Sequence, residues 1–427
     1  MTETTTAQSA QDDALPSSDL ALTVDGLFKV FGKSAHQAVD FLQGGGDRGD
    51  LPKGTTAAVI DASFEVKNGE IFVVMGLSGS GKSTLIRTLN GLLEPTAGSI
   101  LIGEDQLVGA SPRQVRQIRR DRISMVFQHF ALLPHRTVAE NAAYALQLRG
   151  VPKAERMARA EEALAKVGLD GWGGYLPSEL SGGMRQRVGL ARALAAGTDI
   201  LLMDEAFSAL DPLIRKEMQD QLLELQAELG MTIVFITHDL NEAMRLGDRI
   251  AMMRDGRIVQ VGTPEEILTD PANDYVAQFV AEVDRTRVLT ASSIMERPVA
   301  VVGPDAGPRT AHRLMRENQT SALLVVSKDR RVQGIVWEED VVEALKAGAD
   351  SMPRPSREVA TASPDTQLAD LFADAASNRA PIAVVDDRGL LVGLIPRVTL
   401  LAALADPSSN GNDSTPDPTL ENDGGAL

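Results

Sequence analysis

The chain has 427 residues, 43% of them hydrophobic, which is typical of a folded protein with two or three domains. Its formal net charge of −17 argues against a general nucleic-acid-binding surface, and the absence of cysteine excludes disulfides and thiolate metal sites. No uncharged apolar run of 18 residues is present, and the N-terminus lacks a secretory signal, so we expect a cytosolic protein without a membrane span.

The chain begins with residues 1–19, which are rich in Thr, Ser, Ala and Gln and contain no Lys or Arg, as is typical of a disordered lead. From about Leu20 to Val280, apolar runs with strand and helix spacing alternate. This alternation predicts a largely parallel α/β core, which we assign to residues 20–283.

The most informative motif is the segment Gly76–Thr84, which fits the phosphate-binding loop G-x-x-x-x-G-K-[ST]. It follows the apolar run 71–75, expected to be a buried strand, and precedes a predicted helix whose inner face carries Leu85, Ile86, Leu89 and Leu93. Backbone N–H groups of such a loop close around phosphate oxygens at the positive end of the helix. Lys82 should reach the β- and γ-phosphates, and the Ser83 hydroxyl should bind Mg²⁺. The predicted nucleotide-contacting residues are Gly76, Ser78, Gly79, Gly81, Lys82, Ser83 and Thr84.

Five further motifs follow this loop in the chain, and together with it they resemble the ATP-binding-cassette (ABC) ATPases. They are Gln128 after the apolar run 123–127, Leu180–Arg187, Ile200–Glu205, Ser208–Asp211 and Thr237–Asp239. In that family these are the glutamine hinge to a helical subdomain, the signature sequence, the second phosphate motif, the loop after it and the switch histidine. The resemblance implies an ATPase that uses ATP and Mg²⁺.

The carboxylates of the second phosphate motif have the chemistry that ATP hydrolysis requires. Asp204 ends a buried apolar strand, where it can hold Mg²⁺ directly or through water, and Glu205 would polarise the attacking water as general base. The resemblance implies that His238 contacts the γ-phosphate and the opposite subunit. We also expect Gln128 to take part in catalysis and to bind the metal, together with Ser83 and Asp204.

The signature sequence predicts a partner copy of the same chain. Ser181, Gly182 and Gly183 start a predicted helix whose N-terminal N–H groups can receive phosphate. In the ABC family this site completes the pocket of a second copy, so that two chains enclose two ATP molecules head to tail. One chain alone should therefore be nearly inactive.

Adenine normally stacks on an aromatic residue upstream of the phosphate loop in this family. Phe31 is the first candidate and Phe28 the second, and the alternative for each is an aromatic side chain packed in the core. The segment 34–56, which contains the flexible run Gly44–Gly46, separates Phe31 from the strand expected at Ala57, and this departs from the common pattern.

The region after Arg285 repeats itself. Leu323–Val326, a polar turn and Gly334–Val336 are echoed by Ile382–Val385, a polar turn and Gly393–Ile395, and each half has an upstream helix, 309–317 or 367–377. Such a duplication indicates two small α/β units stacked on their apolar faces, which we assign to residues 284–345 and 346–406. Residues 407–427 form an acidic tail expected to be unfolded, which either solvates the chain or senses ionic conditions.

The insertion after Phe31, the phrase Met75–Gly81 and the C-terminal duplication narrow the resemblance. Over residues 22–405 the chain resembles the ATPase subunit of glycine betaine/proline betaine importers, in which the repeat is a pair of cystathionine-β-synthase-type (CBS) domains. The implied fold is a P-loop ABC ATPase core with a helical subdomain, followed by a tandem CBS-type α/β pair. The implied partners are integral membrane permease subunits, with an external substrate-binding protein reached through them, and the implied location is the inner face of the cell membrane.

Other functions stay open at this point. The cargo could instead be choline, carnitine or proline, and other classes are a soluble ABC ATPase acting on nucleic acid or ribosomes, or an adenine-nucleotide sensor. The acidic charge and the apolar run Phe130–Pro134, which offers a groove for a partner helix or packs inside the helical subdomain, argue against the soluble ATPase and against a nucleic-acid partner.

The function of the repeat pair has two alternatives. In related domains the cleft between the units binds adenine nucleotides, including cyclic dinucleotides, or senses ionic strength. Many nucleotide-binding pairs place a hydroxyl and an acid after the second glycine-containing strand. Here Trp337–Asp340 offers Asp340 without the hydroxyl, and Pro396–Thr399 offers no acid. The pair therefore either binds a regulatory nucleotide or serves as dimer architecture.

Overall fold

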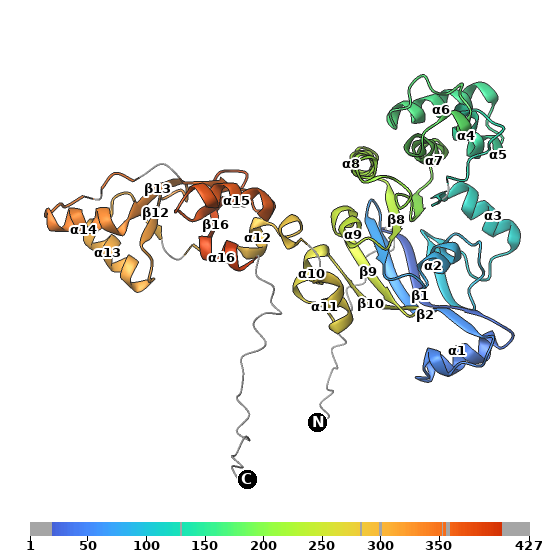
Figure 1. Cartoon of the computed structure of the whole chain (residues 1–427), viewed down its shortest axis with the longest axis horizontal. Helices are drawn as coiled ribbons and strands as arrows, with labels where there is room; N and C mark the ends of the chain where they lie inside the picture. Colours follow the sequence, from blue (N-terminus) through green and yellow to red (C-terminus); the bar gives the residue numbers. More distant parts are fainter. Residues whose placement is uncertain are drawn as a thin grey trace, which may run out of the picture. The chain divides into compact units, whose positions relative to one another are not determined.

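The computed structural model describes residues 19–128, 130–281, 284–298, 301–351, 353–355 and 359–403. The predicted lead, apart from Asp19, and the predicted acidic tail lie outside these residues. The chain divides between Val280 and Ala281 into two compact units, and each is described by itself (Figure 1).

The first unit contains two sheets. Its strands are β1 (Leu20–Phe31), β2 (Thr56–Lys67), β3 (Ile71–Met75), β4 (Ala97–Ile102), β5 (Asp105–Gln106), β6 (Ile123–Val126), β7 (Ile200–Asp204), β8 (Thr232–Thr237), β9 (Arg249–Arg254) and β10 (Arg257–Gly262). The four-stranded sheet has the order β2-β1-β4-β5 and is antiparallel. The six-stranded sheet has the order β10-β9-β3-β8-β7-β6, in which only the β10–β9 pair is antiparallel. The predicted, largely parallel α/β core is confirmed.

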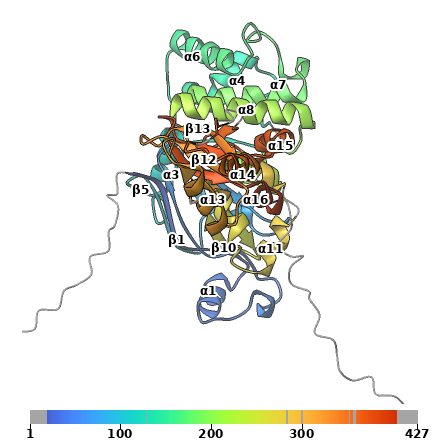
Figure 2. The same cartoon turned by 90° about the vertical axis from the view of Figure 1, so that its left-hand side faces the viewer.

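Helices cover these sheets and form a separate helical part. They are α1 (Ala35–Gln43), α2 (Lys82–Leu89), α3 (Pro112–Asp121), α4 (Val138–Ala142), α5 (Tyr144–Leu148), α6 (Lys153–Lys166), α7 (Gly182–Ala196), α8 (Pro212–Leu229), α9 (Leu240–Leu246), α10 (Pro264–Thr269) and α11 (Asp274–Val280). Helices α4, α6 and α7 gather at the end of the unit opposite α1 (Figures 1 and 2). Local sequence fixes the helix starts, as where Thr137 and Glu140 form a reciprocal capping box at α4.

The core of the first unit lies between the sheets and under α2. Strands β3, β7 and β8 are buried at every position, because both faces of a central parallel strand are covered. Phe64 of β2 stacks on Phe72 of β3 with 5.0 Å between ring centroids, which joins the two sheets. Leu85, Ile86 and Leu89 of α2 pack into the same core, as their spacing predicts, whereas Leu93 lies beyond the helix end.

The insertion between β1 and β2 folds into a helix that sequence analysis did not predict. In α1, Ala38, Val39 and Leu42 are buried against Phe28 and Ile60 of the first sheet. The run Gly44–Gly46 only ends this helix, so the insertion is a packed cover over one end of β1 and β2 and not a flexible loop.

The second unit contains the predicted duplication. Its strands are β11 (Val301–Val302), β12 (Ala322–Val326), β13 (Val332–Trp337), β14 (Thr361–Ala362), β15 (Ile382–Val385) and β16 (Leu391–Ile395). Its helices are α12 (Ala291–Ile294), α13 (Pro308–Glu317), α14 (Glu338–Lys346), α15 (Leu368–Ser377) and α16 (Arg397–Ala402). The sheets β11-β12-β13 and β14-β15-β16 repeat the same pairings, including an irregularity at the end of the second strand of each, at Val325/Val326 and at Val384/Val385.

The two repeats pack on each other through apolar faces. Leu324 and Ile335 of the first repeat share one buried cluster with Ala383 and Leu391 of the second. The backbone N–H of Leu391 donates to the carbonyl of Arg330 at 2.8 Å, which holds the repeats in register.

The start of the second unit belongs structurally to its second repeat. Leu289 and Ala291 are buried in one cluster with Leu368 and Leu400, and the N–H of Leu368 donates to the carbonyl of Leu289 at 3.0 Å. The predicted boundary between the repeats, at residues 345 and 346, stays a prediction. The segment 284–298 precedes the first repeat in sequence but packs on the second.

Within the residues that the structure describes, none of the helices is long and apolar enough to cross a membrane.

Candidate active site

The phosphate-binding loop joins β3 to α2 and is pressed against two neighbouring strands. A Cβ atom on Gly81 would lie 2.0 Å from the carbonyl oxygen of Ala58 in β2, and one on Gly76 would lie 2.1 Å from that of Met253 in β9. Both glycines also have positive φ, +106° and +153°. Only glycine fits at these two positions, so the backbone of the loop is shaped by its contacts with both sheets.

Lys82 is held inside this loop at the start of α2. Its side chain is 4% exposed, and Nζ donates to the carbonyl oxygens of Gly76 at 2.8 Å and Leu77 at 3.0 Å. Burial lowers the pKa of Lys82, and the carboxylates of Glu205 and Asp204 oppose that shift. The loop thus presents a desolvated cation at a helix N-terminus, which suits a phosphate group.

The other predicted loop residues lie around this cation. Ser78 and Gly79 are exposed on the loop, and Thr84 is in the first turn of α2, where its carbonyl accepts from Thr88 at 2.8 Å.

Ser83 and Asp204 meet at the end of β7. The Ser83 hydroxyl donates to Asp204 Oδ1 at 3.3 Å, and Asp204 is buried. Burial raises the pKa of Asp204, while the Ser83 hydroxyl lowers it. In the described part of the chain no group of three or more His, Asp or Glu side chains could hold a metal ion by itself. Two oxygen donors of this kind fit Mg²⁺, which proteins usually bind through one or two side chains plus substrate phosphates.

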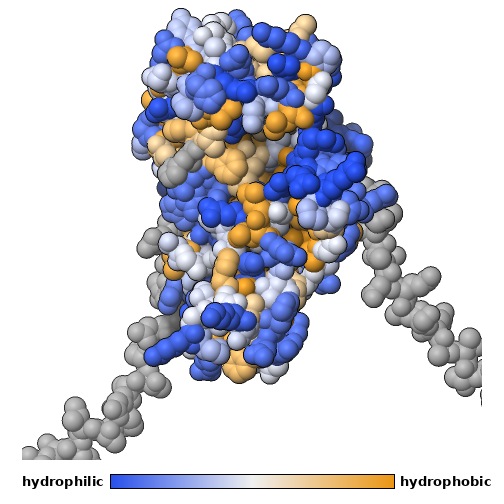
Figure 3. Space-filling model, turned by 90° about the vertical axis from the view of Figure 1, so that its right-hand side faces the viewer, coloured by the Kyte–Doolittle hydropathy of each residue, from blue (hydrophilic) through white to orange (hydrophobic). Residues whose placement is uncertain are grey.

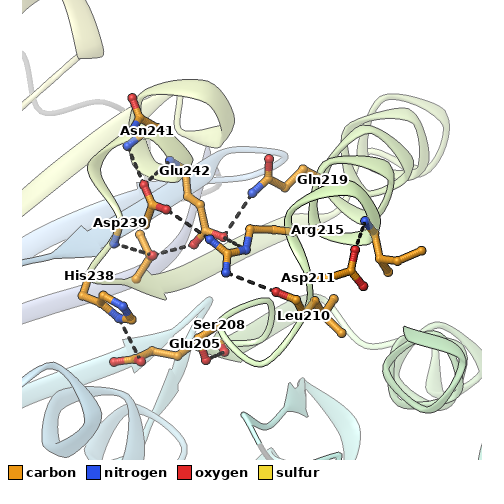
Figure 4. Close-up of polar contacts among 12 residues, drawn as sticks. Glu205, Ser208, Leu210, Asp211, Arg215, Gln219, His238, Asp239, Asn241 and Glu242 are labelled. Atoms are coloured by element: carbon orange, nitrogen blue, oxygen red, sulfur yellow. Dashed lines mark hydrogen bonds and ion pairs between the residues drawn. The ribbon is translucent and has the colours of Figure 1, made fainter. Parts of the chain in front are cut away.

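Glu205 and His238 lie side by side after β7 and β8 (Figure 4). Glu205 Oε2 is 3.0 Å from His238 Nδ1, and the His238 side chain is 56% exposed. Glu205 has a φ of +46°, an uncommon conformation for a residue with a side chain, and its N–H donates to the carbonyl of Ile236 at 3.0 Å. Strained backbone of this kind concentrates at functional sites, where the surrounding structure enforces it.

Gln128 joins the same constellation from the end of β6. Its Nε2 donates to the Ser208 hydroxyl at 3.3 Å, and that hydroxyl donates to the carbonyl of Glu205 at 2.9 Å. Hydrogen bonds therefore connect four of the predicted motif segments through Gln128, Ser208, Glu205 and His238.

The signature residues lie elsewhere in the unit. Ser181 caps α7 by accepting from the N–H of Met184 at 3.3 Å, and a Cβ on Gly183 would lie 2.7 Å from a methyl group of Ile214 in α8. Among the described residues, no hydrogen bond or ion pair joins Ser181, Gly182 or Gly183 to the phosphate loop. The contacts of these residues are thus with α7 and α8.

The two aromatic candidates for adenine stacking differ in exposure. Phe28 is 1% exposed and packs in the core under α1, so it has no ring face to offer a ligand. Phe31 is 41% exposed at the end of β1, opposite Thr56, with Lys29 Nζ 5.0 Å from its ring centroid. Phe31 therefore remains the predicted residue for adenine stacking.

Sequence analysis missed a polar network next to this site. Arg215, Gln219 and Glu242 lie together between α8 and the turn that carries His238 (Figure 4). The available signal was weak, because Glu242 is one polar residue among the buried Ala243, Met244 and Leu246 of a short helix.

Comparisons with known proteins follow the same division of the chain. The family model described as ABC transporter matches residues 59–208, and the model described as CBS domain matches residues 291–347. The solved structure of cbiO1 from Clostridium perfringens, described as part of the ABC transporter complex cbiONQ, matches with a TM-score of 0.50 and 27% identity, covering 61% of this chain and 94% of that one.

Two curated relatives match nearly end to end. This chain is 48% identical over 409 residues to the glycine betaine transport ATP-binding protein OpuAA of Bacillus subtilis, covering 94% of this chain and 98% of the relative. It is 50% identical over 394 residues to the glycine betaine/carnitine transport ATP-binding protein GbuA of Listeria monocytogenes, covering 92% and 99%.

Proposed function

The chain belongs to the family of glycine betaine transport ATP-binding proteins of ABC transporters, and on this premise we propose that it hydrolyses ATP to drive import of glycine betaine or a related osmolyte through separate membrane subunits. The observation that carries the proposal is the hydrogen-bonded set Gln128, Ser208, Glu205 and His238 beside the buried Lys82 and Asp204. An adenine-nucleotide sensor that only binds ATP would not need all of these catalytic residues.

Binding of ATP follows from the loop geometry. Lys82 would exchange the carbonyls of Gly76 and Leu77 for the β- and γ-phosphates, and Phe31 would stack on adenine. Asp204 and Ser83, with Gln128, would hold Mg²⁺. When bound, Mg²⁺ neutralises charge on the phosphate oxygens during transfer.

Hydrolysis then depends on Glu205 and His238. The Glu205 carboxylate accepts a proton from the attacking water as the water oxygen bonds to the γ-phosphorus. The bond from that phosphorus to the β-phosphate oxygen breaks, which leaves ADP and inorganic phosphate. The contact of Glu205 with His238 at 3.0 Å orients the carboxylate, and the exposed His238 ring remains available to the γ-phosphate.

A second copy of the chain would complete each site. The exposed Ser181 and the helix start at Gly182 and Gly183 would receive the γ-phosphate of ATP bound by the partner copy. The exposure of Ser181 at the start of α7 supports this head-to-tail arrangement.

Contact with the permease would use the region between the sheets and the helical part, at the cytoplasmic face of the membrane. Leu132 and Leu133 in the predicted run are half-buried. In the same unit, β6, α3, α5 and the end of α7 line a groove of about 590 Å³. On the side of the unit that carries α3 and α5, hydrophobic surface adjoins strongly hydrophilic surface (Figure 3). The groove residues are Arg113, Arg116, Gln117, Arg119, Arg120, Ile123, Ser124, Ala145, Leu148, Arg149 and Ala196.

Substitution of Leu132 tests this contact. We expect Leu132→Asp to abolish transport in the assembled transporter, because a carboxylate would be desolvated against the permease. Leu229→Asp, on the exposed end of α8, is the matched control and should transport normally. Normal transport by a folded Leu132→Asp variant would contradict the proposed contact.

The cargo is tested by ATPase activity of the chain reconstituted with its membrane and binding subunits. We expect glycine betaine to stimulate turnover, with the response measured across a salt series. Stimulation by choline, carnitine or proline, but not by glycine betaine, would keep the mechanism and replace the cargo. Turnover that no osmolyte affects would contradict an importer.

For the second unit we propose dimer architecture rather than nucleotide binding. Two observations count against a nucleotide site and support this assignment: Trp337–Asp340 lacks the hydroxyl and Pro396–Thr399 lacks the acid, and the buried side chains among the described residues of this unit are apolar. Isothermal titration of a fragment starting at Ala281 with adenine mono-, di- and triphosphates and cyclic dinucleotides should give no binding heat. Saturable heat with any of them would favour a regulatory nucleotide site instead.

A further inference from the structure

Arg215 of α8 contacts three separate segments next to the proposed catalytic residues. Its Nη2 donates to the carbonyl of Leu210 at 3.2 Å, and its Nη1 is 3.4 Å from Asp239 Oδ2. Its Nε lies 3.9 Å from Glu242 Oε1 (Figure 4). One guanidinium thus spans the loop 208–211, the turn after β8 and the first turns of α9.

Glu242 fixes the other side of this arrangement. Its side chain is 6% exposed, accepts from the Thr237 hydroxyl at 2.6 Å and accepts from the Gln219 amide at 3.1 Å. The Thr237 hydroxyl in turn accepts from the N–H of Asp239 at 3.0 Å. A buried carboxylate is tolerated where several donors satisfy it, and here those donors come from α8 and from Thr237, the residue before His238.

The segments held by Arg215 are the same ones that contact Glu205. Loop 208–211 carries Ser208, whose hydroxyl donates to the Glu205 carbonyl, and the turn carries His238, which contacts the Glu205 carboxylate. A shift of either segment would therefore displace Glu205 relative to the other, and a misplacement of about 1 Å costs on the order of a hundredfold in rate.

We propose that Arg215 is a positioning residue that holds the loop 208–211 and the His238 turn in one fixed arrangement around Glu205. The inference rests on the proposed ATPase function and adds to it a residue that touches neither nucleotide nor metal. Arg215 acts through His238 and Ser208, and Glu242 keeps the guanidinium in place.

The chemistry of arginine suits this role better than that of lysine. A planar guanidinium presents five N–H donors in fixed directions, so it can bond to Leu210 and Asp239 together. A lysine ammonium can stay near Glu242 but cannot reproduce both directed contacts. Arg215→Lys should therefore be folded and partly impaired.

The chain supplies a matched control on the same two helices. Arg245 of α9 forms an ion pair with Asp220 of α8, and both side chains are more exposed than Arg215. Arg245→Met removes a link between α8 and α9 without touching the loop 208–211 or the His238 turn. It separates loss of helix packing from loss of positioning.

The first measurement is steady-state ATPase activity of the full chain assembled with its membrane subunits. Arg215→Met should lower kcat by at least about tenfold and change KM for ATP by less than about twofold, because the phosphate loop is untouched. Arg215→Lys should fall between it and the parent chain, and Arg245→Met should stay within about twofold of the parent. Equal losses in Arg215→Met and Arg245→Met, or parent-like kcat in a folded Arg215→Lys, would overturn the inference.

The decisive measurement combines Arg215→Met with His238→Ala. If Arg215 acts through His238 as well as Ser208, its loss in the His238→Ala background should give a clearly smaller fold-loss than in the parent chain, because residues that act as a unit are non-additive. Fold-losses that multiply would overturn the inference. Failure of the proposed ATPase function would show in the parent complex itself, whereas failure of this inference shows only in the ratios between variants.

Discussion

The two units differ in what they bury. In the first unit Lys82, Asp204 and Glu242 are each less than 10% exposed, together with neutral polar side chains such as Gln219 and Thr237. In the described residues of the second unit, the buried side chains are apolar. Burial of a charge costs several kcal/mol unless partners compensate, so the first unit retains a cost that the second avoids. Lys82, Asp204 and Glu242 lie at or next to the proposed site, whereas Glu70, which is also buried, precedes β3 at the end away from the phosphate loop and is paired with Arg249. The apolar interior of the second unit is consistent with the proposed scaffold role.

Glu205→Gln gives the largest expected effect and tests the functional half of this comparison. Removal of a general base costs about a hundredfold or more in kcat, while ATP binding should persist because Lys82 and Ser83 are unchanged. ATPase assays and retention of radiolabelled ATP by the assembled transporter measure both. Glu224→Gln, an exposed carboxylate on α8, is the control, and normal turnover by Glu205→Gln would refute the role of the residue.

Leu324→Ala tests the scaffold half. The side chain lies in the cluster that joins the two repeats, so truncation should destabilise the second unit by about 2–5 kcal/mol and leave KM for ATP unchanged. Scanning calorimetry of the full chain measures the loss, with Leu401→Ala, an exposed leucine on α16, as control. A large change in KM without a change in unfolding would mean that the unit acts on the ATP site.

Asp204 links burial to pH. Because burial raises its pKa above the ordinary value of 3.8, protonation sets in at higher pH than for an exposed aspartate as the solution is acidified. Only the deprotonated form can bind Mg²⁺, so the Mg²⁺ concentration for half-maximal ATPase activity should rise on acidification, before ordinary aspartates titrate. Asp199→Asn, at an exposed ion pair with Arg122, should leave this profile unchanged. A Mg²⁺ requirement that is flat down to the ordinary range would contradict the assignment.

The sequence predicted those parts of the fold that depend on local chemistry. The phosphate loop and the strands before Asp204 and His238 follow from short motifs, and the repeat follows from its own periodicity. These signals are reliable because few other residues fit the same positions. At Gly81 a neighbouring carbonyl leaves no room for a side chain, and a strand buried on both faces must be apolar throughout.

Other parts depend on contacts between distant segments and could not be read locally. Helix α1 is short and ends at three glycines, and it packs on Phe28 and Ile60, which lie outside the insertion, so its own residues did not predict it. Residues 284–298 pack on the second repeat although they precede the first. Arg215 belongs to no sequence motif, and its proposed role follows only from its contacts with residues 210, 239 and 242 in the folded chain.

Glu242→Gln has the smallest expected effect, a change in how stability depends on pH, and it tests directly whether a buried charge of the first unit lowers stability. Burial raises the pKa of Glu242 above its ordinary value of 4.5, against the opposing effect of the Thr237 hydroxyl. Between the unfolded and folded pKa values the folded chain binds more protons, so this residue's contribution to stability falls as pH rises through that window. Glutamine does not titrate and removes this loss.

The difference in melting temperature, Glu242→Gln minus parent, should therefore become more positive as the pH is raised from about 4.5 towards 7. The constant part of that difference also contains the hydrogen bonds to Gln219 and Thr237, so the trend with pH is the test and not the value at one pH. Glu224→Gln should show no trend. Glutamine also lacks the negative charge that faces the Arg215 guanidinium, so the same variant should have a lower kcat. A buried charge that lowers stability but supports turnover would then distinguish the first unit from the second. A difference that falls with rising pH would show that the buried carboxylate stabilises the fold, and the contrast between the two interiors would then be one of packing alone.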